Sequence, residues 1–326
     1  MSASTLSAKP LLEAKGLVKR FPVRRGVLQR PQEWVTAVDG VSLTAEPGRT
    51  LGIVGESGCG KSTLGRIVLG LLKPDSGQVV FEGRDLAKSL KQNASDLRRK
   101  IQTVFQDPLE SLDPRWPVGR SIAEPLALLK LTRKETESRV HEALESVQLP
   151  AEISHAFPHE LSGGQRQRVG IARAIIVRPS FVVCDEAVSS LDVSIRGQVL
   201  ALLADLQKKQ GMAYWFISHD LAVVKAISQR VAVMYLGRVV ELGPAQAVFE
   251  TPWHPYTEAL LAAVPTLEKG QAPLRLLPGE PPSARAIPSG CRFRTRCPLA
   301  QPRCAAEDPP LEEKQPGRWV ACHFRP

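Results

Sequence analysis

A glycine-rich segment, Gly55-Glu56-Ser57-Gly58-Cys59-Gly60-Lys61-Ser62-Thr63, constrains the fold of this chain more than any other feature. It fits the phosphate-loop pattern G-x-x-x-x-G-K-[ST], in which glycines let the backbone turn tightly and point its N–H groups at phosphates. The residues before it, Thr50–Val54, are apolar and predict a buried strand, and Ser62 to Leu72 after it predict a helix. Lys61 can then reach the terminal phosphates, and Ser62 can ligate Mg²⁺. The sequence therefore predicts an α/β fold that binds a nucleoside triphosphate.

A second helix begins about a hundred residues further on, at Leu161-Ser162-Gly163-Gly164-Gln165. The helical pattern runs from Gln165 to Val177, and its N-terminus carries small residues, which favour anion binding. No phosphate loop stands beside this helix in the sequence. We therefore expect Ser162, Gly163, Gly164 and Gln165 to complete a nucleotide site on another subunit.

An apolar run, Phe181-Val182-Val183-Cys184, ends in two adjacent acids, Asp185 and Glu186, as a buried parallel strand would. At the carboxyl end of the strand, Asp185 is expected to hold Mg²⁺ through water. Glu186 is the candidate general base for the attacking water. Adjacent strand residues face opposite ways, but the backbone turns at a strand end, so both carboxylates can reach one site.

The order of these segments resembles that of ABC ATPases, a superfamily of P-loop NTPases. The resemblance implies that Gln106, which follows the strand beginning at Ile101, contacts Mg²⁺ and the attacking water. It also implies that Asp192, in Ser189-Ser190-Leu191-Asp192, lies in the loop linking two active sites across a dimer. His219, after the strand Ala213–Ile217, resembles the switch histidine that contacts the γ-phosphate.

The sequence departs from the pattern of the superfamily in a few places. Ala187 stands where proline usually follows the glutamate, and Ser190 stands where alanine is commoner. Phe21 lies where the superfamily places an aromatic residue that stacks on adenine, although tyrosine is commoner there. Trp34 is the alternative residue for this role. Residues 11–49 predict short strands with turns at Gly40 and at Pro47-Gly48, and residues 24–32 predict an exposed loop.

The segments His254-Pro255-Tyr256-Thr257 and Asp107–Arg115 resemble those of the ATPases of oligopeptide and dipeptide importers. The implied fold is a P-loop NTPase with a RecA-like core, an antiparallel β subdomain and an α-helical subdomain. We expect the ATP-binding domain over residues 10–250, with its helical subdomain at about 107–165. Within it, Thr132 and Glu135 predict a capping box at the start of a helix.

Residues 251–326 are expected to form a C-terminal extension with a proline-rich linker over 265–288 and a cysteine cluster. Its cysteines are spaced C-x5-C-x6-C-x17-C, at Cys291, Cys297, Cys304 and Cys322. Clustered thiols in a cytosolic protein bind metal more often than they form disulfides.

Zinc sites usually show tight C-x2-C pairs, which this segment lacks, whereas four thiolates can hold a [4Fe–4S] cluster. Some peptide-importer ATPases are similar in carrying such a cluster. Iron–sulfur, zinc and no metal all stay open. Because the ATP motifs are distant in sequence, we expect the extension to affect stability or coupling to the permease more than basal hydrolysis.

Composition limits the partners of the chain. The formal charge is +10 over 326 residues, but aromatic residues make up only 5% and no long basic block occurs, so a nucleic-acid surface is not favoured. The sequence has no signal peptide and no apolar run near the roughly 18 residues that span a bilayer. We expect a cytoplasmic protein that contacts the membrane through a partner.

The resemblance implies the ATP-hydrolysing subunit of a di- or oligopeptide importer, using ATP and Mg²⁺ at the cytoplasmic face of the inner membrane. The implied partners are a second ATPase subunit, identical or paralogous, two permease subunits and, indirectly, an extracytoplasmic solute-binding protein. An importer for nickel or glutathione is the alternative. A soluble ABC ATPase acting on DNA or ribosomes is disfavoured by the single cassette and by the absence of heptad repeats.

Overall fold

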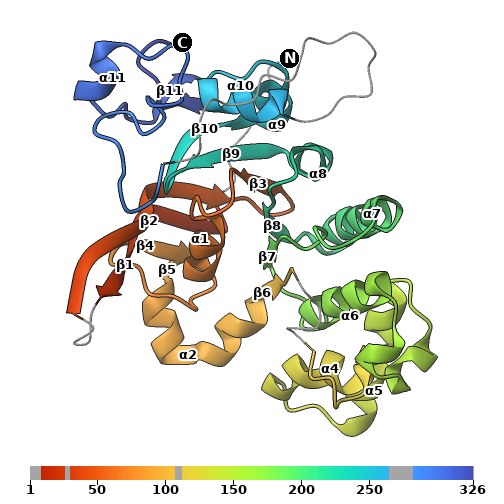
Figure 1. Cartoon of the computed structure of the whole chain (residues 1–326). Helices are drawn as coiled ribbons and strands as arrows, with labels where there is room; N and C mark the ends of the chain where they lie inside the picture. Colours follow the sequence, from red (N-terminus) through yellow and green to blue (C-terminus); the bar gives the residue numbers. More distant parts are fainter. Residues whose placement is uncertain (1–8, 26–29, 107–111, 264–281, 326) are drawn as a thin grey trace, which may run out of the picture.

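The computed structural model describes residues 9–25, 30–106, 112–263 and 282–325. Within these residues, eight strands form the main sheet in the order β11-β12-β10-β9-β3-β8-β7-β6 (Figure 1). The strands are β3 (Thr50–Val54), β6 (Ile101–Val104), β7 (Phe181–Asp185), β8 (Ala213–Ile217), β9 (Arg230–Tyr235), β10 (Arg238–Pro244), β11 (Glu312–Gln315) and β12 (Arg318–Val320). The five strands from β9 to β6 run parallel to one another. Their carboxyl ends therefore lie at one edge, as the predicted P-loop fold requires.

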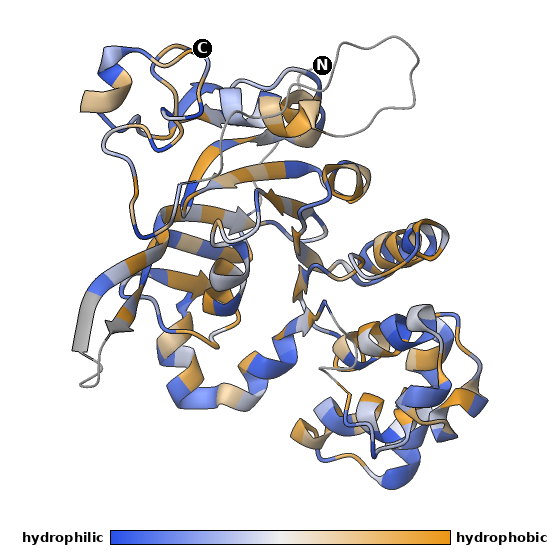
Figure 2. Ribbon diagram, viewed as in Figure 1, coloured by the Kyte–Doolittle hydropathy of each residue, from blue (hydrophilic) through white to orange (hydrophobic). Residues whose placement is uncertain are grey.

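Both faces of the parallel part of this sheet are buried, which explains the nearly continuous apolar runs of its strands (Figure 2). In β7, Phe181 and Val183 face one hydrophobic core, while Val182 and Cys184 face the other. The first core contains helix α1 (Lys61–Val68) and the second contains α6 (Gly163–Ile175), α7 (Val193–Gln210) and α8 (Leu221–Ile227). The sheet therefore separates α1 from α6.

A smaller antiparallel sheet covers α1, with strand order β2-β1-β4-β5. Its strands are β1 (Leu12–Arg25), β2 (Arg30–Ala45), β4 (Ser76–Phe81) and β5 (Arg84–Asp85). The expectation of short strands before residue 49 is wrong, because β1 and β2 form one long hairpin. Gly40 does not make a turn; it lies inside β2 at φ 71°, where the pairing register shifts. The expected turn at Pro47-Gly48 is present.

Helix α2 (Leu86–Lys100) directly precedes β6 in sequence, and a helical region follows that strand. The region contains α4 (Val118–Ala123), η1 (Glu124–Leu128), α5 (Arg133–Ser146), η2 (Ala151–His155), η3 (Pro158–Glu160) and the start of α6. The predicted capping box is confirmed: Glu135 N–H donates to Thr132 Oγ1, and Thr132 N–H donates to Glu135 Oε2. Most of the Asp107–Arg115 segment lies outside the described residues.

The C-terminal part is joined to the main sheet. Helices α9 (Ala245–Glu250) and α10 (Pro255–Ala262) follow β10, and α11 (Pro302–Ala306) precedes β11. Strand β12 pairs antiparallel with β10, with Glu241 opposite Val320, so the extension continues the main sheet (Figure 1). Most of the predicted proline-rich linker lies outside the described residues. Among the helices described, none has the length and apolar character to cross a membrane.

Candidate functional site

The phosphate loop connects β3 to α1, and neighbouring backbone fixes its shape. Gly58 and Gly60 have φ values of 77° and 108°, which favour glycine. A Cβ atom on Gly60 would lie 2.0 Å from the carbonyl oxygen of Ala37, and one on Gly55 would lie 2.2 Å from that of Met234. The glycines at both positions are therefore required by close backbone approach as well as by conformation.

Lys61 is buried at the start of α1, where its Nζ donates to the carbonyl oxygens of Gly55 and Glu56 at 2.7 and 3.0 Å. The helix begins after Gly60, which has no side chain to cap it. The first N–H groups of α1 therefore have no side-chain acceptor at the N-cap and can bind an anion. This places the predicted lysine and the predicted helix N-terminus at one loop.

The predicted Mg²⁺ ligands of two separate motifs lie together. Ser62 Oγ donates to Asp185 Oδ1 at 3.1 Å, joining α1 to the carboxyl end of β7. Burial raises the pKa of Asp185, and the neighbouring carboxylate of Glu186 adds to this effect, while the hydrogen bond from Ser62 opposes it. The Ser62 hydroxyl and the Asp185 carboxylate therefore place two oxygens side by side, and ionising this carboxylate in its buried position costs free energy. Such a pair of oxygens suits Mg²⁺.

Glu186 lies just beyond β7, in a left-handed conformation with φ 49°. Its N–H donates to the carbonyl oxygen of Ile217 at 2.9 Å, which ties the turn to the end of β8. The side chain turns toward His219, with 3.2 Å between Glu186 Oε2 and His219 Nδ1. The structure thus brings together the expected general base and the expected switch histidine.

Gln106 is exposed just after β6, and its carbonyl oxygen accepts a hydrogen bond from Ser190 Oγ at 3.5 Å. Asp192 caps α7, accepting from Ile195 N–H at 3.0 Å and from Ser194 Oγ at 2.7 Å. These two hydrogen bonds, chiefly the one from the Ile195 N–H, hold the pKa of Asp192 below its usual value. The structure therefore places Gln106 beside the Ser189–Asp192 loop.

Ser162 begins α6 with a capping box, accepting from Gln165 N–H at 3.3 Å while Gln165 Oε1 accepts from Ser162 N–H at 2.9 Å. Ser162 and Gly163 are exposed, and a Cβ on Gly163 would meet nothing within 4 Å. Gly164 instead packs closely on Ile195. Because α6 lies on the face of the sheet opposite α1, the structure leaves this segment apart from the phosphate-loop helix of its own chain.

The two candidate adenine platforms are both exposed, Phe21 at 38% and Trp34 at 55%. The hairpin register pairs Phe21 with Val35 and Pro22 with Trp34. Directly paired residues share a face, so Phe21 and Trp34 point to opposite faces of the hairpin. A nucleotide held on one face can stack on only one of them.

Cys291, Cys297, Cys304 and Cys322 are free thiols that line one small enclosed cavity of about 10 Å³. Burial raises the pKa of Cys291 to about 11 and also raises the pKa of Cys297, so these thiols are protonated unless a cation offsets the charge. In the described part of the chain, no three His, Cys, Asp or Glu side chains are positioned to hold one metal ion. The cysteines converge, but the iron–sulfur cluster is not shown.

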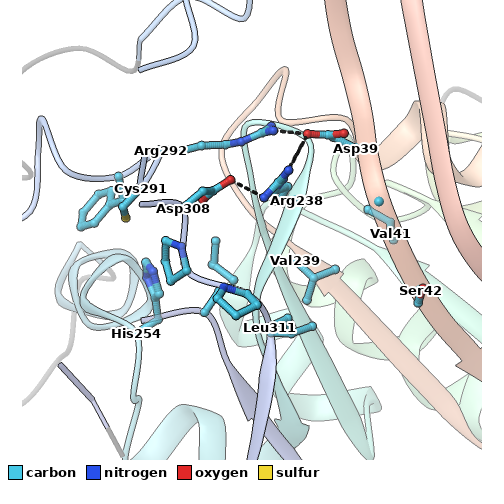
Figure 3. A pocket seen from close by; sticks show the side chains of 16 residues that line it. Asp39, Val41, Ser42, Arg238, Val239, His254, Cys291, Arg292, Asp308 and Leu311 are labelled. Atoms are coloured by element: carbon cyan, nitrogen blue, oxygen red, sulfur yellow. Dashed lines mark hydrogen bonds and ion pairs between the residues drawn. The ribbon is translucent and has the colours of Figure 1, made fainter. Parts of the chain in front are cut away.

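The segment between Cys291 and Cys297 contacts the N-terminal part of the chain and the β9–β10 turn at several points. Arg292 and Arg238 both point at Asp39, and Arg238 also pairs with Asp308, beside a cavity of about 390 Å³ (Figure 3). Although burial opposes it, the two guanidinium groups hold the pKa of Asp39 below its usual range. This network anchors the C-terminal part on β2 and β10.

Two residues to which the sequence assigned no role at the ATP site, Arg296 and Tyr256, contact the phosphate loop itself. Arg296 forms two hydrogen bonds with the carboxylate of Glu56 at 2.9 and 3.0 Å, and Tyr256 Oη accepts from Glu56 N–H at 2.8 Å. The extension therefore contacts an ATP motif although the two are distant in sequence. That it affects stability or coupling to the permease more than basal hydrolysis stays a prediction. A clue existed in Tyr256, which belongs to the His254-Pro255-Tyr256-Thr257 motif.

Comparison with known proteins gives two family matches. Residues 38–189 match the ABC transporter family, and residues 240–304 match the C-terminal region of oligopeptide/dipeptide transporters. A probable peptide ABC transporter ATP-binding protein, y4tS of Sinorhizobium fredii, is 50% identical over 97% of this chain and 90% of its own length. The oligopeptide transport ATP-binding protein OppF of Escherichia coli is 49% identical over 96% of both chains.

Solved structures agree with this assignment of the fold. The structure of cbiO1 from Clostridium perfringens, part of the transporter complex cbiONQ, has a TM-score of 0.64 and 29% identity, covering 74% of this chain and 92% of that one. The cassette MJ0796, a dimer bound to ADP and Pi in a post-hydrolysis state, has a TM-score of 0.63 and 27% identity, covering 72% and 98%. Both likenesses support the P-loop NTPase fold described above.

Proposed function

The chain belongs to the ATP-binding subunits of ABC transporters of the oligopeptide/dipeptide type, and from this we propose that it hydrolyses ATP to energise peptide import. The observation that carries the proposal is the convergence of Lys61, Ser62, Asp185, Glu186 and His219 at the carboxyl edge of one parallel sheet. Their residue types match the tasks of phosphoryl transfer, which needs positioning and charge stabilisation more than covalent chemistry.

In this assignment the chain divides the work among its motifs. The phosphate loop and the N-terminus of α1 bind the phosphates, with Lys61 moving from the loop carbonyls to the terminal phosphates. Ser62, Asp185 and Gln106 would hold Mg²⁺, which would neutralise charge on the phosphates. Glu186 takes the proton of the attacking water, and His219 holds the Glu186 carboxylate and reaches toward the γ-phosphate.

A second subunit completes the site in this proposal. Ser162 and Gly163 offer an exposed helix N-terminus to an anion, yet α6 lies across the sheet from α1. Head-to-tail pairing of two ATPase subunits would place each such segment over the nucleotide of the other. Two permeases would then follow the opening and closing of the pair from the cytoplasmic side of the inner membrane. The second subunit is either identical to this chain or a paralogue of it.

The function is tested by peptide uptake in cells that lack the gene. Wild-type chain should restore ATP-dependent uptake of a radiolabelled oligopeptide, and chain carrying Lys61→Ala should not, because the phosphates lose their cationic partner. Affinity purification from solubilised membranes should recover two integral membrane proteins with the chain. Uptake of nickel or glutathione, with no uptake of peptide, would contradict the peptide assignment and leave the ATPase assignment intact.

We further propose that the extension holds a [4Fe–4S] cluster through Cys291, Cys297, Cys304 and Cys322. The support is the donor set: four free thiols line one small cavity, and Cys291 N–H donates to the carbonyl oxygen of Cys304 at 2.8 Å, which ties the Cys291 segment to α11. Such a cluster would supply the positive charge that lets buried thiols ionise. Zinc is the alternative for the same four thiolates.

Protein purified without oxygen tests the metal assignment. It should be brown, absorb broadly near ~400 nm and contain about four irons per chain. Replacing any one of the four extension cysteines by serine should remove the colour, whereas Cys59→Ser and Cys184→Ser are matched controls outside the extension. Stoichiometric zinc without iron would favour zinc, and protein with neither metal would contradict the hypothesis.

A further inference from the structure

Glu56 is the point where the C-terminal extension meets the phosphate loop. Every polar group of this residue has a partner: its N–H donates to Tyr256 Oη, its carbonyl oxygen accepts from Lys61 Nζ and Cys59 N–H, and its carboxylate accepts from Arg296. Two of these partners come from the loop itself. The other two, Tyr256 and Arg296, lie 200 and 240 residues away in the sequence.

The two distant partners are themselves firmly placed. Tyr256 is fully buried, with its ring 4.6 Å from the ring of Tyr235 and 5.5 Å from that of Phe293. The Arg296 side chain is 5% exposed, and Arg296 N–H donates to the carbonyl oxygen of Phe293 at 3.0 Å. Arg292, four residues earlier, is anchored by Asp39 and by the carbonyl oxygen of Leu236. The extension therefore presents a rigid clamp to Glu56.

We propose that Arg296 and Tyr256 are positioning residues for nucleotide binding: they hold the first half of the phosphate loop in its binding shape and neutralise Glu56. This inference rests on the proposed ATP hydrolysis at the same loop. A carboxylate inside an anion-binding loop repels phosphate unless a cation offsets it. Arg296 supplies that cation in the bidentate geometry that guanidinium and carboxylate groups favour.

The proposal predicts a specific pattern among variants of the pair. Arg296→Gln leaves the Glu56 carboxylate charged and without its cation, so the Kd and the KM for ATP should rise about 5- to 100-fold, the usual span of coupling between sites. The rate at saturating ATP should change far less, because Arg296 does not touch the reacting atoms. Adding Glu56→Gln to Arg296→Gln removes the repulsive charge and should restore most of the affinity.

Tyr256 and the conservative arginine variant add independent checks. Tyr256→Phe keeps the buried ring but removes the hydroxyl that accepts from Glu56 N–H. It should weaken ATP binding only through the loss of this one hydrogen bond. Arg296→Lys keeps the charge but loses the two-point geometry, so its affinity should fall between wild type and Arg296→Gln. Arg325→Gln is the matched control, since Arg325 joins the extension to Glu258 of α10 at 2.8 Å and does not contact the phosphate loop.

The experiment measures MgATP binding by isothermal titration in the full-length protein, together with KM, kcat and the thermal unfolding midpoint. Raised Kd for Arg296→Gln, with recovery in the double variant and normal binding in Arg325→Gln, supports the proposal. Unchanged Kd in both Arg296→Gln and Tyr256→Phe overturns it, and so does equal weakening in Arg325→Gln, which would indicate general loosening. If Arg296→Gln does not fold, Tyr256→Phe decides by the same criterion.

Failure of this inference is separable from failure of the proposed function. Wild-type protein that neither binds nor hydrolyses ATP would contradict the proposed function and with it the clamp. Wild-type protein that hydrolyses ATP while the clamp variants match it in Kd and KM would overturn the clamp alone.

Discussion

Glu186 occupies a backbone conformation that non-glycine residues rarely adopt, with φ 49°. Such a conformation costs free energy and persists where the surroundings fix it. Here the N–H of Glu186 donates to Ile217, and its carbonyl oxygen accepts from Ser189 Oγ at 2.9 Å. The turn directs the side chain to His219 while the preceding Asp185 stays with Ser62. Two adjacent acids thereby serve one site from opposite sides of a strand end.

Removal of the charge at Glu186 gives the first prediction. Glu186→Gln should keep ATP binding but lower hydrolysis by roughly 10²-fold or more, because the amide cannot accept the proton of the attacking water. His219→Ala should lower the rate as well, by freeing the carboxylate. Phosphate release at saturating ATP measures both. Glu145→Gln, at an exposed position of α5, is the control, and a normal rate in Glu186→Gln would show that another group is the base.

The choice between Phe21 and Trp34 gives the second prediction, which rests on their opposite faces. The resemblance favours Phe21, so Phe21→Ala should raise the KM for ATP by about 5- to 150-fold, the loss of about 1–3 kcal/mol of base stacking. Trp34→Ala serves as the matched comparison on the other face. The reverse result, weaker binding only in Trp34→Ala, would transfer the adenine platform to Trp34.

The sequence predicted the residues of the ATP site because their roles depend on local backbone. Lys61 and Ser62 follow from one loop pattern, and Asp185 and Glu186 follow from the end of one apolar strand. Arg296 offered no such signal: it is one of 43 lysines and arginines, and its partner Glu56 lies 240 residues away. A single ion pair across that distance is set by the packing of the whole extension and leaves no periodic trace in the sequence.

At the scale of elements, the extension depends on one buried aromatic residue. Phe293 is 1% exposed and packs edge-on against Tyr235, with ring centroids 5.4 Å apart, and also against Tyr256. It lies between Arg292 and Arg296 in sequence, so its insertion sets the direction of both guanidinium groups. Hydrophobic packing of Phe293 therefore helps to hold the element that carries the clamp, between its two buried arginines.

The third prediction follows from this packing. Phe293→Ala should lower the free energy of unfolding by about 3–5 kcal/mol, through lost transfer energy and a cavity among aromatic rings. Urea unfolding followed by tyrosine and tryptophan fluorescence measures the loss. Leu299→Ala, at a 41% exposed position of the same extension, should change stability far less. Equal losses in the two variants would contradict the assigned role of Phe293.

Elements with a clear period were predicted well, and those set by tertiary pairing were not. The helix from Thr132 follows from its cap and apolar spacing. The sequence did not predict the long hairpin of β1 and β2, because a glycine at position 40 suggests a turn. In the structure Gly40 accommodates a bulge inside a continuous strand.

At the scale of the whole molecule, the main sheet divides the nucleotide machinery. The phosphate loop and α1 belong to one face, and the exposed start of α6 belongs to the other. In the proposed function, one chain would therefore carry two separate parts of a nucleotide site, the phosphate loop and the exposed start of α6. Two chains related head to tail would complete two sites at once, because each place on one subunit would meet the complementary place on the other.

The last prediction tests this arrangement by cross-linking. One tagged copy carries Ser57→Cys, an exposed position of the phosphate loop that avoids the Mg²⁺ ligand Ser62, and a second copy carries Ser162→Cys; both also carry Glu186→Gln, so that ATP persists. A short bismaleimide should then join the two copies when MgATP is present and far less with ADP, because ATP closes the pair. For a paralogous partner, the same experiment in the complete membrane complex places one cysteine in the partner's phosphate loop.

Pairing Ser162→Cys with Ser138→Cys, an exposed position of α5, provides the geometric control, and chains without added cysteines show the background from the native thiols. Joined species should be absent from both controls. Products formed only within one chain, or products independent of ATP in every combination, would contradict head-to-tail pairing. An ATP-dependent product between subunits would assign the exposed α6 terminus to the nucleotide of the neighbouring subunit and explain why Ser162 and Gly163 face solvent in the single chain.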